Sequence, residues 1–239
     1  PGRLLLLGGM TMSMPRIRVW DLPTRLFHWL LVALIIAMII TGKIGGNLID
    51  WHARIGITIT GLVAFRLVWG FVGSTYARFA TFFPTPGRIL AYLRGQWHEP
   101  GHNPLGACSV FALLALIAFQ IATGLTGNDD IAFRGPLFDL VGKELSDKLN
   151  GLHKLSVNLL FALIALHVGA ILFYVHVKKD NLVRPMLTGW KSHGGRPASG
   201  GGAAALIVAL AVACAAVYGA SGTWLPAPPP PPPAATPSW

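Results

Sequence analysis

The chain has 239 residues, of which 53% are hydrophobic and only 12% are charged, and its mean hydropathy is +0.58. These values exclude an ordinary soluble domain and are typical of a protein that crosses a membrane several times. The formal net charge of +10 would suggest nucleic-acid binding in a soluble chain, but the basic residues fall in loops between apolar segments, which predicts membrane topology and no nucleic-acid partner.

Five apolar segments follow one another along the chain, each long enough to cross a hydrocarbon core of about 30 Å as a helix. They cover residues 26–42, 55–73, 104–126, 155–177 and 203–225. Before the fourth segment, residues 136–149 have the pattern of a short amphipathic helix. The sequence therefore predicts an all-α integral membrane protein with a four-helix bundle and a fifth, C-terminal transmembrane helix.

The basic residues are distributed unevenly between the two sides that alternating helices define. One side holds twelve of the 19 basic residues, namely Arg3, Arg16, Arg18, Arg25, Arg78, Arg88, Arg94, Lys178, Lys179, Arg184, Lys191 and Arg196. The other side holds Lys43, Arg134, Lys143 and Lys148. Because loops rich in Lys and Arg stay in the cytoplasm, this bias predicts a cytoplasmic N-terminus and a periplasmic C-terminus. The acidic loop before the fourth segment then faces the periplasm.

The regions between and beyond these segments complete the expected organisation. Residues 1–15 are an N-terminal cytoplasmic tail, residues 16–191 hold the four-helix domain, and a Gly-rich cytoplasmic linker covers 192–202. The fifth helix spans 203–225, and residues 226–239 form a stiff polyproline tail. The two cysteines lie inside apolar segments and no C-x-x-C-H occurs, which excludes covalent haem attachment by that motif.

Histidines within the apolar segments carry the functional signal. An imidazole in hydrocarbon is costly without a partner, so His28, His52, His153 and His167 are candidates for a functional role, against the alternative of interfacial side chains satisfied by backbone or water. His153 and His167 are 14 residues apart. On a helix this spacing gives about 21 Å of rise and nearly the same direction, with one histidine near each membrane surface.

Each of these two histidines has a partner at its own depth. His28 lies at the inner start of the first segment and His52 at the outer start of the second. The pairing by depth is His28 with His167 and His52 with His153. Bis-histidine ligation of two b-type haems is the economical interpretation of two complementary pairs.

The surroundings of the histidines fit a porphyrin. Glycines along these helices would let a macrocycle approach the backbone, although close helix packing is an alternative for each of them; they are Gly42, Gly56, Gly61, Gly151 and Gly169. Haem propionates need cations, and the candidates are Arg25 and Arg66 at the inner haem and Arg54 and Lys154 at the outer one, with a snorkelling role as the alternative for each.

The other four histidines are weaker candidates. His176 follows His167 by nine residues and points away from its face of the helix. His98 and His102 lie in an inner loop where a quinone or proton site is one interpretation, because imidazoles titrate near neutral pH. His193 lies in the Gly-rich linker and is expected to be solvated.

Several motifs in order resemble the prokaryotic cytochrome b561 family, which includes the b-type cytochrome subunits of nickel-iron hydrogenases. The resemblance covers roughly residues 16–191. The motifs are VWDLPTRLFHW (19–29), WHARIG (51–56), RLVWGFVGS (66–74), GHNPLG (101–106), GLTGNDD (124–130) and HVGAILFYVHVKKDNLVRPMLTG (167–189). The family implies a four-helix core with two haems b on the same histidine pairs, in a bacterial inner membrane.

The resemblance also implies a function. We expect transmembrane electron transfer between a membrane quinone, ubiquinone or menaquinone, and a redox partner such as a cytochrome c or a respiratory complex. A superoxide:quinone oxidoreductase acting alone, with Arg54, Lys154 or Lys148 guiding the anion, is one alternative. A haem-bearing anchor subunit of a larger hydrogenase-like or photosynthetic complex is another. A transporter is disfavoured because no inverted repeats or broken helices are evident.

Overall fold

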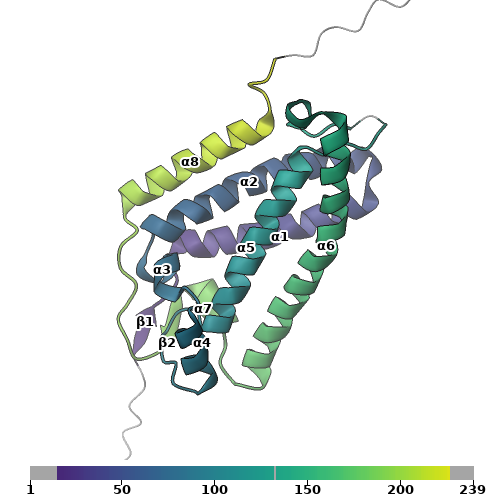
Figure 1. Ribbon diagram of the computed structural model, residues 1–239. Helices are drawn as coiled ribbons and strands as arrows, with labels where there is room; N and C mark the ends of the chain where they lie inside the picture. Colours follow the sequence, from purple (N-terminus) through teal and green to yellow (C-terminus); the bar gives the residue numbers. More distant parts are fainter. Residues whose placement is uncertain (1–14, 132, 227–239) are drawn as a thin grey trace, which may run out of the picture.

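The computed structural model describes residues 15–131 and 133–226, and this part of the chain is almost entirely helical (Figure 1). Five of its helices are long and apolar enough to cross a membrane. They are α1 (Leu22–Ile44), α2 (Ile49–Val72), α5 (Pro104–Leu125), α6 (Phe138–His176) and α8 (Ala203–Ser221). The prediction of an all-α membrane protein with five spanning helices is confirmed. Residues 1–14 and 227–239, which make up most of the expected N-terminal and polyproline tails, lie outside the described residues.

The five helices run alternately up and down, and the shorter elements gather at one end (Figure 1). We call this the sheet end, because strands β1 (Arg16–Arg18) and β2 (Trp190–Ser192) pair there antiparallel. The sheet end also holds η2 (Thr75–Ala77), α3 (Phe79–Phe82), α4 (Pro86–Leu93) and α7 (Val183–Thr188). The opposite end holds η1 (Gly46–Leu48) and the loop before α6.

Three helices begin with the same local chemistry at the sheet end. A polar residue followed within two positions by proline caps α1, α4 and α5: Asp21, Thr85 and Asn103 accept hydrogen bonds from backbone N–H groups three residues later. Proline fits the first turn because its missing N–H would have no partner there. Asp21 also accepts hydrogen bonds from Trp69 Nε1, at 3.0 Å, and from Ser74, so it ties the start of α1 to the end of α2.

Two boundaries differ from the sequence prediction. The short helix expected at 136–149 is part of α6, a helix of 39 residues that is interrupted only at Gly142, where φ is 70° and ψ is 174°. No proline separates Gly142 from His176, so the amphipathic turns continue into the membrane span. Helix α8 ends at Ser221 rather than at 225, because Gly222 adopts the left-handed conformation that terminates helices.

Helix α2 lies at the centre of the packing, in contact with α1, α5 and α8 (Figure 1). A Cβ atom on Gly61 would lie 2.6 Å from Val217 Cγ2 and 3.3 Å from the carbonyl oxygen of Ala213, both on α8. The expectation that Gly61 makes room for a porphyrin is therefore wrong. Its small size instead lets α8 approach the backbone of α2.

Candidate functional site

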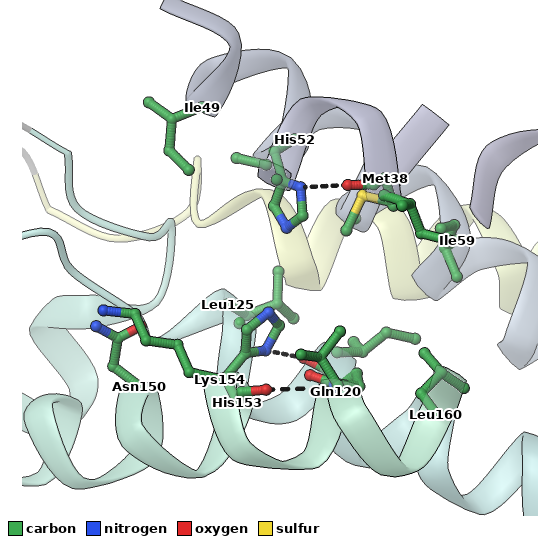
Figure 2. A pocket seen from close by; sticks show the side chains of 18 of the residues that line it. Met38, Ile49, His52, Ile59, Gln120, Leu125, Asn150, His153, Lys154 and Leu160 are labelled. Atoms are coloured by element: carbon green, nitrogen blue, oxygen red, sulfur yellow. Dashed lines mark hydrogen bonds between the residues drawn. The ribbon is translucent and has the colours of Figure 1, made fainter. Parts of the chain in front are cut away.

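A cavity of about 600 Å³ lies between α1, α2, α5 and α6 toward the end opposite the sheet (Figure 2). Its walls are largely aliphatic, and polar groups enter them at a few positions. These include His52 from the first turn of α2, His153 from α6, and Lys43, Asn150 and Lys154. A mostly apolar cavity of this size with a few convergent polar groups is typical of a cofactor site.

His52 and His153 face each other across this cavity, and Figure 2 shows both rings pointing inward. Their ring centroids are 6.3 Å apart and the ring planes are inclined at 81°. Two imidazoles that bind one metal ion from opposite sides, at about 2 Å per nitrogen, bring their ring centres to about 6 Å. The pairing of His52 with His153 by depth therefore corresponds to a geometry that holds one metal ion.

Backbone carbonyls define which nitrogen of each ring is free. His52 Nδ1 lies 3.2 Å from the carbonyl oxygen of Met38, and His153 Nδ1 lies 3.1 Å from that of Gln120. A carbonyl oxygen only accepts hydrogen bonds, so Nδ1 carries the hydrogen in both rings. Each Nε2 is left with its lone pair, which is the arrangement that metal-ligating histidines use.

The two histidines share a repeated local motif on the preceding helix. Three residues after each carbonyl, a threonine hydroxyl lies beside the same Nδ1: Thr41 at 3.2 Å from that of His52 and Thr123 at 3.1 Å from that of His153. Each threonine donates its own proton to carbonyls one turn back, so its oxygen accepts from the ring. The stretches MIITG (38–42) and QIATG (120–124) carry this repeat.

A glycine follows each threonine because the ring lies against the helix backbone. A Cβ atom on Gly42 would lie 2.9 Å from His52 Cε1, and one on Gly124 would lie 3.0 Å from His153 Cε1. Gly42 and Gly56 line the cavity, as expected from the sequence, whereas a Cβ on Gly151 or Gly169 would meet no atom within 4 Å. Gly124 is not among the glycines predicted to lie beside a porphyrin. The signal that identifies it is the Thr-Gly pair that precedes each of the helices carrying His52 and His153.

The cations at this cavity differ in part from the sequence expectation. Lys154 lines the cavity, whereas Arg54 is absent from the lining and its guanidinium stacks on the ring of Trp51 at 5.4 Å. Lys43, which the sequence pattern alone does not single out, lines the cavity with its ammonium 5.6 Å from the ring centre of Phe161. Two lysines from α1 and α6 are thus available to an anionic group.

The second histidine pair lies toward the sheet end. His167 Nδ1 is 3.4 Å from Ser109 Oγ, and His28 packs edge-on against Trp29 with a buried Nδ1 that has no partner in the described residues. Burial and the charges of Arg66, His28 and His167 lower the pKa of the loop residue His102 to about 3.

His102 is a residue of this site that the sequence ranks low. Its ring centroid lies 4.6 Å from that of Trp20 and 4.5 Å from that of Phe82, and its buried Nδ1 has no partner in the part of the chain that the structure describes. The other three minor candidates differ from it: His98 and His176 are exposed, and His193 is half-buried beside Gly194. Two sequence signals keep this loop close to the bundle. The next residue, Asn103, is the N-cap of α5, and Pro104 begins that helix.

Buried polar atoms without partners gather at the sheet end. Arg66 is 3% exposed, its guanidinium covers the ring of Phe79 at 4.6 Å, and one of its Nη atoms has no partner within residues 15–131 and 133–226. Arg25 donates to the carbonyl of Leu187 on α7, but its Nε is unpartnered. The remaining unpartnered nitrogens of Arg and Trp here belong to Arg78 and Trp97. Buried donors are normally hydrogen-bonded, so this group of donors fits an anionic acceptor that the protein itself does not supply.

Both sites fit the haem expected from the sequence. At the opposite end, two rings with free Nε2 atoms face each other across a cavity that two lysines border. At the sheet end, two further histidines accompany arginine and tryptophan donors that lack acceptors. Axial imidazoles and cations for the propionates are the groups that a b-type haem requires from a protein.

Comparisons with known proteins agree with this chemistry. The family model described as prokaryotic cytochrome b561 matches residues 19–189. A probable Ni/Fe-hydrogenase 1 B-type cytochrome subunit of Escherichia coli K12 is 24% identical over 215 residues, covering 73% of this chain and 90% of the relative. A probable Ni/Fe-hydrogenase B-type cytochrome subunit of Azotobacter vinelandii is 26% identical, covering 72% and 87%. No solved structure was found to match. The chain is a membrane b-type cytochrome that belongs to the prokaryotic cytochrome b561 family.

Proposed function

We propose that this protein carries electrons across the membrane through two haems b, between a membrane quinone and a redox partner. The observation that carries the proposal is the facing of His52 and His153 at 6.3 Å with both Nε2 atoms free. One pair alone would make a single-haem protein. With the second pair, His28 and His167 at the sheet end, the protein would hold one haem toward each membrane surface and could transfer electrons between them.

Helix α6 links the two sites because it supplies one ligand to each. His153 and His167 are 14 residues apart on it, which is about 21 Å along its axis. Two histidines would hold a haem at each site, and each bound haem would supply one-electron redox chemistry. The protein's own residues hold the rings, supply the charges and exclude water.

Further side chains position each haem. Thr41 and Thr123 fix the orientation of the imidazoles at the opposite end, and Lys43 and Lys154 neutralise the propionates there. At the sheet end, Arg66, Arg25 and His102 would offer the second haem buried nitrogen atoms that lack a partner among the described residues. Arg54, which stacks on Trp51, is a weaker candidate than Lys43 for a propionate contact.

The uneven distribution of charge orients the protein. The sheet end carries most of the basic residues and therefore lies in the cytoplasm of a bacterial inner membrane, with the C-terminus in the periplasm. The acidic residues of the loop before α6 would steer a basic periplasmic partner, such as a cytochrome c. The relatives are described as hydrogenase subunits, so a hydrogenase-like complex is the other partner class. Ubiquinone or menaquinone completes the path.

The proposal is tested by reduction with quinol. The purified protein should show b-type bands in a reduced-minus-oxidised spectrum, with about two haems per chain. A water-soluble ubiquinol or menaquinol analogue, added anaerobically, should reduce these bands faster than its spontaneous reaction with free haem. Bands that respond to dithionite but to neither quinol would contradict the quinone part of the proposal and leave the di-haem part intact.

A role as a haem-bearing anchor subunit is the second candidate. It is favoured by helix α8, which lies beyond the matched residues 19–189 and packs along α2. Purification from native membranes under mild detergent decides between the two: a stoichiometric partner that contains its own redox centre favours the anchor. Superoxide-dependent quinone reduction by the isolated chain would instead support an enzyme acting alone.

A further inference from the structure

A second cavity lies at the sheet end, apart from both histidine pairs. Its volume is about 250 Å³, and it is enclosed by β1, β2, α7 and the turn between α6 and α7. Its lining consists of Arg16, Asp180, Asn181, Arg184, Pro185, Trp190, Lys191 and Ser192. No residue of the proposed haem sites belongs to this lining.

The walls of this cavity are fixed by backbone hydrogen bonds. Strand β1 pairs with β2 in the register of Arg16 with Ser192 and Arg18 with Trp190. The carbonyl oxygen of Gly189, in the left-handed C-cap of α7, accepts from Val19 N at 2.8 Å. Arg184 therefore has a defined position relative to β1, because α7, β1 and β2 are joined as one unit.

The cavity carries an excess of positive charge. Three cations, Arg16, Arg184 and Lys191, line it together with one acid, Asp180. Asp180 is already paired with Lys191, at 3.1 Å. Within residues 15–131 and 133–226, no acid forms an ion pair with Arg16 or Arg184. Two guanidinium groups therefore remain available to an anion, and their planar donor pattern matches the oxygens of a phosphate group.

An apolar border adjoins these cations. Val183 and Leu187 lie four residues apart on α7 and so on one face of it, and Leu187 is 53% exposed. Trp190, which follows α7 and lines the cavity, is 45% exposed. A free inorganic anion would gain nothing from this border, whereas a ligand that carries hydrocarbon chains beside its phosphate would cover it.

The cavity lies beside the ends of two of the helices that are long enough to span a membrane, where lipid headgroups are expected. Strand β1 ends at Arg18, shortly before α1 begins at Leu22, and α7 begins at Val183, after the turn that follows the end of α6 at His176. Exposed tryptophan beside basic residues is the composition expected at the interface of a membrane. Basic pockets between helices on the cytoplasmic side are suited to anionic lipid headgroups.

We propose that this cavity binds the phosphodiester headgroup of an anionic phospholipid, with Arg16 and Arg184 as the phosphate ligands. The acyl chains lie along Val183 and Leu187. Since the cavity joins the segment before α1 to the segment after α6, a bound lipid holds these two segments together. The proposal is independent of the direction of electron flow and of the partner.

The test measures thermal unfolding of the haem-loaded protein in an uncharged detergent. Added dioleoylphosphatidylglycerol should raise the unfolding midpoint, because a ligand that binds only the folded state stabilises it. Dioleoylphosphatidylcholine and inorganic phosphate should leave the midpoint unchanged. No difference between the two lipids for the unaltered protein overturns the proposal, and an equal rise with inorganic phosphate overturns the lipid assignment.

Two double variants locate the effect. Arg16→Gln with Arg184→Gln should weaken the phosphatidylglycerol response roughly 30-fold in lipid concentration, the factor expected when two direct guanidinium–phosphate contacts of about 1 kcal/mol each are lost. Arg94→Gln with Arg196→Gln removes the same charge from exposed residues at the same end but outside the cavity, and should respond like the unaltered protein. Equal responses of the two double variants would show a nonspecific charge effect and contradict the site. Both should retain their b-type spectra.

Discussion

At the scale of single residues, the hydrogen bonds of His52 and His153 define the chemistry of the site. Each Nδ1–H is shared between a backbone carbonyl and a threonine hydroxyl, so the ring can neither flip nor change tautomer without losing both contacts. A donor that is held in this way makes the opposite nitrogen more electron-rich. We therefore expect the two threonines to act on the potential of the proposed haem rather than on its presence.

This role of the threonines predicts a shift in potential. Thr41→Val removes one of two acceptors of His52 Nδ1 and should raise the midpoint potential of one haem by roughly 20–40 mV, the equivalent of about 0.5–1 kcal/mol of hydrogen bonding. Spectroscopic redox titration measures it. Thr58→Val, which removes a hydroxyl that donates to the carbonyl of Arg54, is the matched control on α2 and should leave both potentials unchanged.

Replacing a glycine that lies beside a histidine ring is expected to remove one haem. Gly124→Ala places a methyl group 3.0 Å from His153 Cε1, which is closer than carbon atoms pack, so the ring must move from its position. We expect haem content to fall from about two to about one per chain, measured by pyridine haemochrome assay. Gly151→Ala, on the same helix as His153 but in open space, should retain both haems. Full haem content in Gly124→Ala would contradict the expectation that the ring of His153 cannot yield to the added methyl group.

The residues that the sequence identified and those that it missed differ in a physical way. The four membrane histidines stand out in the sequence because an imidazole in hydrocarbon is costly. The position of each histidine along its helix gives its depth in the membrane, and depth alone is enough to pair them. Lys43 and His102 lie where loops meet the bundle, so the approach of Lys43 to the cavity and of His102 to the sheet-end site depends on how the chain turns after α1 and before α5. No periodicity encodes such a turn. The contact of Gly61 with α8 depends on which helices are neighbours, which one chain's hydropathy does not reveal.

At the scale of elements, α8 is an outer helix that packs on α2 (Figure 1). The hydropathy pattern predicted its existence and side of entry, but not its neighbour. Its contact with α2 involves Gly61, Ala213 and Val217, and none of these lines the cavity between the histidines. The fifth helix therefore packs on the outside of α2 and does not contribute these residues to the cavity between His52 and His153.

This packing predicts a separation between stability and haem binding. Gly61→Val introduces a side chain where a Cβ alone would lie 2.6 Å from Val217, and overpacking of this kind costs about 1–3 kcal/mol. The thermal midpoint should fall by several degrees while the haem content stays unchanged. Gly219→Val, on α8 in open space, is the control and should unfold like the unaltered protein. Loss of haem in Gly61→Val with a normal midpoint would place Gly61 against a porphyrin after all.

At the scale of the whole molecule, the five helices and their alternation followed from composition and segment length, because a bilayer admits few other arrangements. The boundaries were less predictable. Gly142 breaks α6 only locally, and Gly222 ends α8 earlier than hydropathy alone suggests, since both effects depend on the backbone conformation of one residue. The molecule that results carries one histidine pair toward each end, joined by the shared helix α6.

The pairing of the histidines is the central claim, and the haem content of double alanine variants tests it most directly. His52→Ala with His153→Ala removes both ligands of one haem, so one haem per chain should remain, and His28→Ala with His167→Ala should likewise retain one. His52→Ala with His167→Ala removes one ligand from each site, so neither haem should stay bound. One haem retained in this crossed variant, with none in the other two, would contradict the pairing.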